Sequence, residues 1–119
     1  MLDTATQIKG MFIGGNWISS GSTFDDINPS TGAVWAHIPE GGRAEAREAI
    51  AAAQSAFPAW SKLHFQDRAK ILLKAADVWE TRKMDYVAAA QAEGGGWFGK
   101  GMFEAGYVPD VFRAAAAMC

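Results

Sequence analysis

The sequence predicts a small antiparallel β-ribbon followed by about four α-helices, and two patterns support this fold class. Between residues 11 and 40, short apolar runs alternate with turns rich in Gly, Asn, Ser and Pro, which is typical of strands joined by tight turns. From residue 41 onward the chain is rich in alanine, and apolar residues recur every three or four positions, the period of an α-helix. We therefore expect a flexible amino terminus at 1–10, a strand segment at 11–40 and a helical segment at 41–119.

Turn-forming residues divide the strand segment. Gly14, Gly15 and Asn16 suit a tight hairpin, because glycine and asparagine adopt the left-handed backbone conformation that such turns need. Pro29 disfavours a helix at the residue before it, and the Ser-Thr-Gly after it forms a second turn. Pro39 ends the last extended run, which alternates as a half-buried strand does. The predicted strands cover residues 11–13, 17–18, 24–28 and 33–38.

Proline, glycine and capping residues set the limits of the expected helices. Pro58 is expected to stop the first helix, and Asp85 is expected to cap the start of the third. A run of three glycines ends the third helix, and Pro109 implies a kink or a break in the fourth near Tyr107. On the second helix, Trp79 lies on the face expected to be buried. The predicted helices cover residues 43–57, 66–82, 85–93 and 97–118.

Length and composition favour one modest globular domain. The 119 residues are 50% apolar and 20% charged, which argues against disorder, and the longest apolar run is far shorter than a bilayer span. The net charge of -2 and the pI of about 5.6 argue against a nucleic-acid-binding or anionic-membrane-binding surface. One cysteine excludes an internal disulfide framework and fits a reducing compartment, so a cytoplasmic location is expected.

The sequence finishes in an uninterrupted helix-forming run. Residues 111–119 contain no Gly, Asn or Pro that would end a helix. An ordinary helical carboxy terminus is one interpretation, but truncation explains the pattern better. Five Trp and seven Phe are also more aromatic surface than a few thin helices and a hairpin easily cover. We therefore expect exposed aromatic surface, which would mark the contact with a remainder of the protein.

Four sequence pieces stand out: F-I-G-G-N-W at 12–17, I-N-P-S-T-G at 27–32, A-F-P-A-W-S at 56–61 and D-R-A-K-I-L-L at 67–73. Taken together and in this order, they resemble the amino-terminal signature of the aldehyde dehydrogenase superfamily. Each piece alone occurs in many proteins, whereas four at suitable spacing are specific. The resemblance covers nearly the whole chain and is loosest after Glu93.

The resemblance implies an α/β parent with a Rossmann-type cofactor domain, of which this chain is an amino-terminal fragment. The implied enzyme oxidises an aldehyde to a carboxylic acid with NAD or NADP, through a thiohemiacetal and a thioester that an activated water hydrolyses. It also implies a homodimer or homotetramer. The segment 41–119 would belong to the cofactor-binding domain and be incomplete at its carboxy end. No catalytic or cofactor-binding residue is expected in this chain, so the fragment alone is expected to be inactive.

A local feature points to a subfamily. E-G-G-G-W-F-G-K at residues 93–100 stands where Glu-Thr-Gly-Lys is commoner in the family, and Met-Phe-Glu follows it. This combination is similar to members that act on benzaldehyde- or vanillin-like substrates. After Arg113, where relatives often have two tyrosines, this chain has Ala114 and Ala115, which departs from the family pattern.

Two site hypotheses follow from the resemblance. Many relatives hold a structural monovalent cation with a backbone carbonyl before the Asn-Pro and an acidic residue that closes the third helix, and hard cations prefer such oxygen ligands. The matching residues are Ile27, with Asp26 as a further candidate, and Glu93, for which a solvated helix-end carboxylate is the alternative. The last helix lies near the aldehyde tunnel in the family, which puts Phe103 and Tyr107 on the tunnel side. Plain core packing is the alternative for both aromatics.

Other reactive or glycine-rich residues carry no expected function. The glycines at 94–96 follow a helix and lack the G-x-G-x-x-G spacing of a dinucleotide-binding loop. His37 is expected to point outward from its strand and His64 to lie at a helix entrance, and neither has a second metal ligand at suitable spacing. Cys119 lacks the base, the oxyanion donor and the preceding cofactor loop that an aldehyde-attacking thiolate needs, so we interpret it as a small apolar residue.

A second interpretation stays open. The chain would then be a non-enzymatic helical interaction module, or a decayed remnant, that binds a partner through an aromatic face. This accounts for the missing chemistry but not for four family-like pieces in order. The coding sequence beyond Cys119 separates the two, because a Rossmann-type half favours the enzyme and a stop codon favours the module. The natural aldehyde and the choice between NAD and NADP also stay open.

Overall fold

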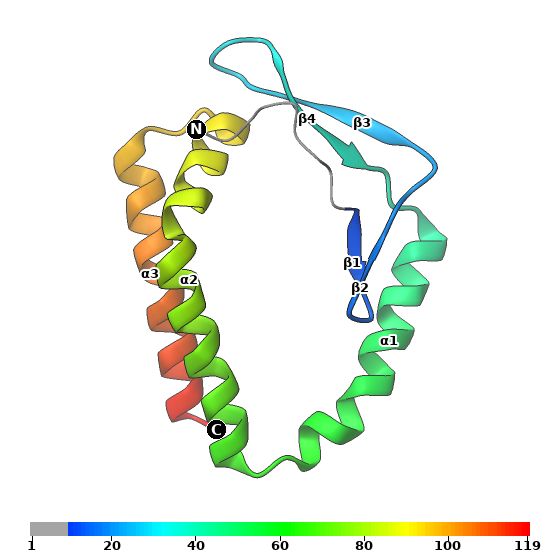
Figure 1. Cartoon of the computed structure of the whole chain (residues 1–119), viewed down its shortest axis with the longest axis vertical. Coiled ribbons are helices and arrows are strands. Elements are labelled where there is room, and N and C mark those ends of the chain that lie inside the picture. Colours follow the sequence, from blue (N-terminus) through cyan, green and yellow to red (C-terminus); the bar gives the residue numbers. More distant parts are fainter. Residues whose placement is uncertain (1–9) are drawn as a thin grey trace. The chain divides into compact units, whose positions relative to one another are not determined.

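Four short strands precede three long helices in residues 10–119, which are the residues that the computed structural model describes (Figure 1). The chain divides into two compact units, one up to Ser61 and the other at Lys62–Cys119. Apart from Gly10, the predicted flexible terminus at 1–10 lies outside the described residues. In chain order the elements are β1 (Met11–Ile13), β2 (Asn16–Ile18), β3 (Thr23–Ile27), β4 (Val34–Pro39), α1 (Arg43–Lys62), α2 (Phe65–Gly94) and α3 (Phe98–Ala117).

A two-residue turn joins β1 and β2 in the first unit. Ile13 pairs with Asn16 in an antiparallel register, so Gly14 and Gly15 form the whole loop. Their φ angles are +59° and +84°. Positive φ at both central residues defines a type I′ turn, whose twist matches that of the flanking strands. The predicted hairpin at this position is therefore confirmed.

The loop between β3 and β4 is built around Asn28. Its backbone N–H donates a hydrogen bond to the Ala33 carbonyl oxygen at 2.9 Å, and its side-chain Oδ1 accepts one from the Ser30 N–H at 2.9 Å. An Asn side chain that replaces a backbone acceptor in this way is a common means of closing a turn. In the described residues β3 pairs only with β4, so two separate two-stranded sheets replace the single ribbon that the sequence predicts.

Helix α1 begins at Arg43, as the sequence predicts, but ends later than predicted. It starts after Gly42, whose N–H donates to Glu45 Oε2 at 2.7 Å. Hydrogen bonds from the Glu45 N–H and, to a smaller extent, from the Gly42 N–H lower the pKa of the Glu45 carboxyl. Pro58 does not stop the helix, which continues to Lys62. A proline removes one hydrogen bond of the helix, here to the Gln54 carbonyl, and water can satisfy that carbonyl because both residues are exposed. The prediction of a stop at Pro58 was wrong.

Helix α2 is a single helix of 30 residues where the sequence predicts two. Asp85, the expected cap of a separate third helix, lies inside α2 and makes an ion pair with Arg82 at 3.7 Å. No Gly or Pro occurs between the two predicted helices, so nothing interrupts the backbone hydrogen bonds there. The chain therefore has three helices in its described part, and the prediction of about four was wrong.

Each end of α2 has an identifiable cap. At the start, His64 Nδ1 accepts a hydrogen bond from the Gln66 N–H at 3.4 Å. At the end, Gly95 adopts the left-handed conformation with φ +62° and ψ 14°, and its N–H donates to the Gln91 carbonyl oxygen at 3.0 Å. Glycine favours this position because it has no Cβ to clash with the backbone. The capping confirms that His64 lies at a helix entrance.

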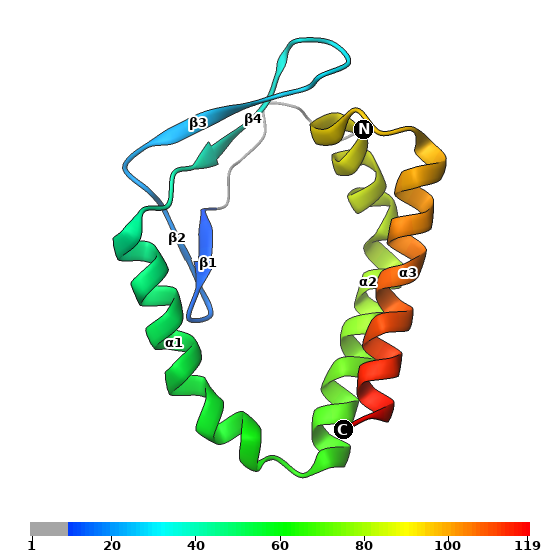
Figure 2. The same ribbon diagram turned by 180° about the vertical axis from the view of Figure 1, so that it is seen from behind.

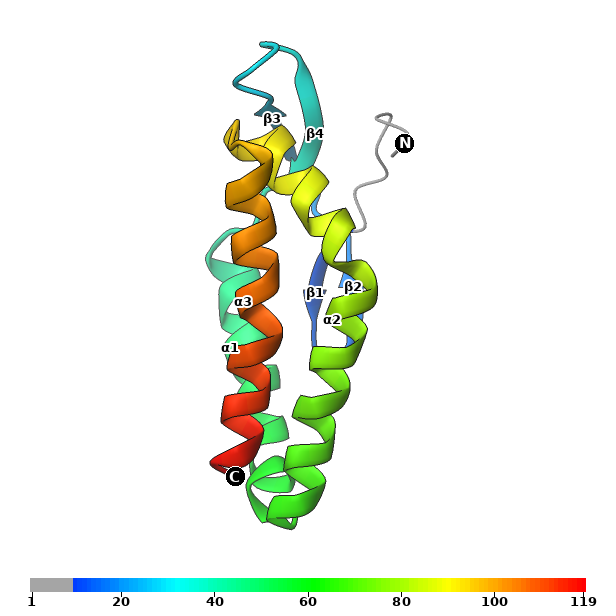
Figure 3. The same cartoon turned by 90° about the vertical axis from the view of Figure 1, so that its left-hand side faces the viewer.

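Helices α2 and α3 lie side by side and run in opposite directions within the second unit (Figures 2 and 3). Small residues allow this close approach. A Cβ added at Gly101 would lie 3.1 Å from Val87 Cγ1, which is tighter than ordinary van der Waals contact. Pro109 lies inside α3 and does not break it. The buried residues of this pair are Ala76, Val87, Gly101, Ala105, Pro109 and Ala116.

Much aromatic surface remains exposed, as the sequence predicts. Helix α1 has no buried residue, and its Phe57 lies in solvent. Among the helices that the structure describes, none is long and apolar enough to cross a membrane. The other exposed Phe, Trp and Tyr side chains are Phe12, Trp17, Phe24, Trp60, Phe65, Trp97, Phe98, Phe103 and Tyr107.

Candidate functional site

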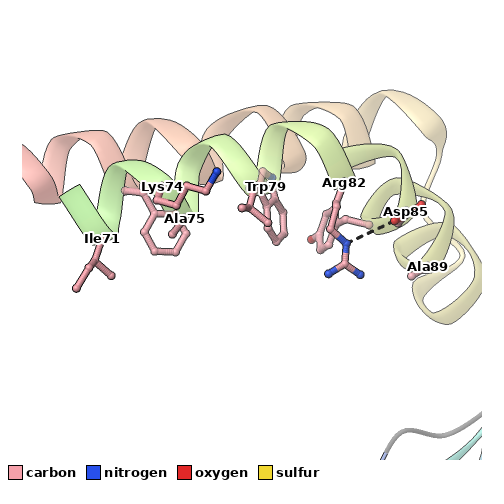
Figure 4. Close-up of a pocket in the computed structure, with 10 residues that line it drawn as sticks. Ile71, Lys74, Ala75, Trp79, Arg82, Asp85 and Ala89 are labelled. Carbon is pink, nitrogen blue, oxygen red and sulfur yellow. Dashed lines mark ion pairs between the residues drawn. The ribbon is translucent and has the colours of Figure 1, made fainter. Parts of the chain in front are cut away.

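A mostly apolar groove of about 730 Å³ runs along one side of the α2–α3 pair (Figure 4). The rings of Trp79 and Tyr86 stand next to each other in its wall, with centroids 5.2 Å apart and planes at 48°. Charged side chains lie at its edges, where Arg82 pairs with Asp85. The remaining lining residues are Ile71, Lys74, Ala75, Val78, Ala89 and Phe112.

A pair of stacked aromatic rings stands on α3. Phe103 and Tyr107 have ring centroids 6.5 Å apart and nearly parallel planes, at 9°. The exposed fractions are 75% for Phe103 and 62% for Tyr107, so neither side chain belongs to the core of the described unit. The predicted sharing of one helix face is confirmed. The tunnel-side role and plain core packing in a longer protein both stay predictions.

Trp79 connects the groove to α3. Its indole Nε1–H donates a hydrogen bond to the backbone carbonyl oxygen of Ala105 at 2.8 Å. The Trp79 side chain is half-buried and Ala105 is fully buried, with 0% exposure. A hydrogen bond in such a place is worth more than an exposed one, because losing its donor leaves a carbonyl that water does not reach. The sequence predicts that Trp79 is buried but not what its N–H binds.

Three polar side chains form a second link between α2 and α3. Lys100 Nζ lies 2.8 Å from Glu104 Oε1, and the Tyr86 hydroxyl donates to Glu104 Oε2 at 3.1 Å. These donors lower the pKa of Glu104, Lys100 first and Tyr86 second. In turn the hydrogen bond to Glu104 raises the pKa of Tyr86 and the pKa of Lys100. The cluster thus favours a carboxylate, an ammonium and a neutral phenol together.

The residues of the predicted cation site are all described, but they lie in different units. Ile27 ends β3 and Asp26 precedes it, at the point where the pairing with β4 becomes irregular. Glu93 is exposed in the last turn of α2 and has no ion-pair partner among the described residues. No group of three or more His, Cys, Asp or Glu side chains in the described part of the chain lies close enough to hold a metal ion. The cation site therefore stays a prediction.

The remaining candidates lie where the sequence places them. His37 is exposed on β4, and its Nδ1 lies 2.7 Å from Asp25 Oδ1 on the neighbouring strand. Cys119 is half-buried at the end of the chain. The glycines at 94–96 connect two helices, and no strand leads into them. These glycines therefore lack the strand-to-helix context of a dinucleotide-binding loop.

Solved aldehyde dehydrogenases contain this fold. The chain superposes with a TM-score of 0.88 on an NAD-dependent benzaldehyde dehydrogenase from Corynebacterium glutamicum, over 95% of this chain and 25% of that one, at 23% identity. It also matches an NAD-dependent aldehyde dehydrogenase from Sinorhizobium meliloti with a TM-score of 0.88, over 94% of this chain and 23% of that one, at 27% identity. The architecture is therefore that of an aldehyde dehydrogenase segment.

Sequence comparison then assigns the family. A model of the aldehyde dehydrogenase family matches residues 17–119, so the chain belongs to that family. A vanillin dehydrogenase from a Pseudomonas species is 38% identical over 112 residues, which are 91% of this chain and 23% of that protein. A 2-aminomuconic semialdehyde dehydrogenase from Bos taurus is 38% identical over 82 residues, 69% of this chain and 17% of that protein. The chain thus spans only 17% to 23% of the length of these curated relatives.

Sequence reasoning missed the two links between α2 and α3. The spacing of Lys100 and Glu104, four residues apart, is a signal for an ion pair on one helix face. The addition of Tyr86 depends on how the two helices pack, which no local pattern in the sequence encodes. The same holds for the bond from Trp79 to Ala105.

Proposed function

We propose that the protein to which this chain belongs is an NAD- or NADP-dependent aldehyde dehydrogenase that oxidises an aldehyde to a carboxylic acid. The match of residues 17–119 to the family model carries this proposal. The structural neighbours with names that specify NAD support the nicotinamide cofactor. The proposal includes NADP as the alternative cofactor.

The role proposed for this chain is structural and substrate-facing, not catalytic. Residues 41–119 would form the helices that flank the cofactor-binding domain, and residues 11–40 would form the two strand pairs that steady the assembly. The glycines at 94–96 do not fit a dinucleotide, so the cofactor would be held by other parts of the protein. Cys119 is not proposed as the nucleophile, because no base, oxyanion donor or cofactor loop precedes it in the sequence.

An aromatic aldehyde is the proposed substrate. The stacked, exposed pair of Phe103 and Tyr107 supports this, because aromatic side chains bind flat apolar molecules well. A vanillin dehydrogenase and a benzaldehyde dehydrogenase are among the proteins to which this chain is similar. Other relatives are named for semialdehydes, so the aromatic preference is the finer part of the proposal.

A cofactor-reduction assay tests the functional proposal. The 119-residue chain, mixed with NAD or NADP and benzaldehyde, should give no reduced cofactor, whereas the protein that continues this sequence should. Turnover by the 119-residue chain alone would contradict the placement of the catalytic groups. A coding sequence that stops after Cys119 would contradict the enzyme itself and favour the non-enzymatic interaction module, which the exposed aromatic surface also supports.

The substrate-facing role of α3 is tested in the protein that continues this sequence. Phe103→Ala should lower kcat/KM for benzaldehyde about tenfold, mainly through KM, since the lost apolar contact is worth roughly 1.4 kcal/mol or more. The same change should leave kcat/KM for acetaldehyde nearly unchanged. Trp97→Ala, another exposed aromatic on the same unit, is the matched control and should change neither value. Equal losses for both aldehydes would contradict an aromatic subsite.

A structural monovalent cation, held by the Ile27 carbonyl and the Glu93 carboxylate with Asp26 nearby, is proposed from the family resemblance. Potassium or sodium should then raise the melting temperature above that in a bulky organic cation at equal ionic strength. Glu93→Gln should remove this difference, while Glu48→Gln, an exposed carboxylate on α1, should not. A cation effect that survives Glu93→Gln would contradict the site.

We also propose a homodimer or homotetramer in the cytoplasm, with a small-molecule aldehyde as the binding partner. The family resemblance supports the oligomer, and the single cysteine supports a reducing compartment. Light scattering on the protein that continues this sequence tests the assembly, and a monomer would contradict it. Fluorescence imaging of the tagged protein tests the location.

A further inference from the structure

Pro109 leaves a gap in the hydrogen bonds of α3. In an α-helix the N–H of each residue donates to the carbonyl four residues earlier, which for position 109 is the carbonyl of Ala105. Proline has no N–H, so the Ala105 carbonyl has no donor from its own helix backbone. Both residues are buried against α2, and water therefore cannot take the place of the missing donor as it can at an exposed proline.

The indole of Trp79 fills this gap from the neighbouring helix. Its Nε1–H donates to the Ala105 carbonyl oxygen at 2.8 Å, a normal length for a strong N–H···O bond. Trp79 lies in the middle of α2, in the row of side chains along the groove (Figure 4). Among the described residues, no buried side-chain nitrogen or oxygen lacks a hydrogen-bond partner.

The turn of α3 that receives this bond carries the stacked aromatic pair. Phe103 and Tyr107 stand two residues before and two residues after Ala105, which puts them on roughly the opposite side of a helix with about 100° per residue. Ala105 thus faces α2 while both rings face away from the core. A shift of this turn on α2 moves the two rings with it.

We propose that Trp79 is a positioning residue, which substitutes for the absent backbone donor of Pro109 and so holds the α3 turn that presents Phe103 and Tyr107. The role of these rings toward an aromatic aldehyde rests on the proposed function, but the positioning itself does not. Trp79 is not proposed to touch substrate or cofactor. Its effect passes through the Ala105 carbonyl.

A double-mutant cycle tests the substitution of one donor for the other. Trp79→Phe should raise the unfolded-to-folded ratio of the chain at least about fivefold, because it leaves a buried carbonyl unpaired. In the Pro109→Ala background the helix regains its own donor, and the same change should retain only its smaller packing effect. Trp97→Phe is the matched control, since that indole is exposed and makes no hydrogen bond in the described residues. It should leave the unfolded-to-folded ratio nearly unchanged in both backgrounds.

Nuclear magnetic resonance gives a readout that a change of stability alone does not move. Under native conditions the Trp79 indole N–H should exchange with solvent more slowly than that of Trp97. Trp79→Phe should weaken the cross-peaks between α2 and the α3 turn that carries Phe103 and Tyr107, and Pro109→Ala in the same chain should restore them. An equal loss of stability in both backgrounds, an unprotected Trp79 N–H, or unchanged cross-peaks would each overturn the proposal.

These measurements use the 119-residue chain and no aldehyde, so their outcome is independent of the dehydrogenase assay. Coupling between Trp79 and Pro109 without benzaldehyde turnover in the continued protein would refute the function and leave the positioning in place. Benzaldehyde turnover without coupling between Trp79 and Pro109 would refute the positioning role and leave the proposed function in place.

Discussion

Gly95→Ala should destabilise the α2–α3 hairpin by about 1 kcal/mol. Gly95 ends α2 with φ +62° and ψ 14°, a left-handed conformation in which a Cβ approaches the backbone. A non-glycine residue there loses about 1 to 2 kcal/mol, and the lower entropy of alanine in the unfolded chain returns part of it. The left-handed backbone angle at Gly95 is therefore the basis of this magnitude.

The neighbouring glycine provides a matched control with the opposite sign. Gly94 is the last residue of α2, has no positive φ, and has nothing within 4 Å of an added Cβ. Gly94→Ala should therefore stabilise the chain by up to about 1 kcal/mol, since alanine is the better helix former. The free energies of unfolding of the two variants should thus differ by about 1 to 2 kcal/mol.

Urea denaturation followed by far-ultraviolet circular dichroism measures both variants. Thermal melts should separate by several degrees, because about 1 kcal/mol corresponds to roughly 4 to 8 °C in a unit of this size. Gly95→Ala as stable as the parent chain, or equal effects at both positions, would refute the assignment of Gly95 as a left-handed cap. The slope of free energy against urea should stay unchanged, which checks that both variants unfold in the same way.

Three further predictions concern other contacts. Glu104→Gln should make the free energy of unfolding fall less steeply as the pH is lowered. Hydrogen bonds from Lys100 and Tyr86 lower the pKa of Glu104 in the folded chain. The stabilisation by Glu104 is therefore present above the ordinary pKa of about 4.3 and is lost as the pH falls through the folded-state pKa. Urea titrations across acidic pH measure this, and parallel curves for both chains would contradict it. Arg113→Ala should change stability by no more than about 1 kcal/mol, less at high salt, because the ion pair from Arg113 to α2 is exposed, and a larger, salt-independent loss in urea would contradict that account. Asn28→Ala should destabilise the first unit by about 1 kcal/mol through the lost turn bond to a backbone N–H, and a near-parent urea midpoint would contradict this.

Local chemistry made the strand segment predictable. Gly14 and Gly15 admit positive φ at low energy, and Asn28 closes a turn with its own side chain, so the turns depend on residues close in sequence. The ends of the helices were harder to predict from the sequence. Asp85 is a good cap in isolation, but an uninterrupted backbone and the packing on α3 extend α2 through it. Pro58 likewise ends no helix where water can reach the carbonyl it leaves unpaired.

Some features of the candidate site could likewise be predicted from the sequence, and others could not. That Phe103 and Tyr107 share a helix face follows from their spacing, and the structure confirms it. The sequence also shows that Pro109 must leave one carbonyl without a donor. It does not show that Trp79, 26 residues away along the chain, supplies the replacement, because that depends on the register between two helices. Ile27 and Glu93 remain predictions from family resemblance alone.

The contact between Gly101 and Val87 limits how this protein can vary. With a hypothetical Cβ only 3.1 Å from Val87 Cγ1, the seam between α2 and α3 has no spare volume at that level. Any larger side chain at position 101 must push α2 and α3 apart. This displacement would move the rings of Phe103 and Tyr107 on the outer side of α3. Mutational drift, whether natural or in a laboratory library, is therefore freer on the solvent side of α3 than on the side that meets α2.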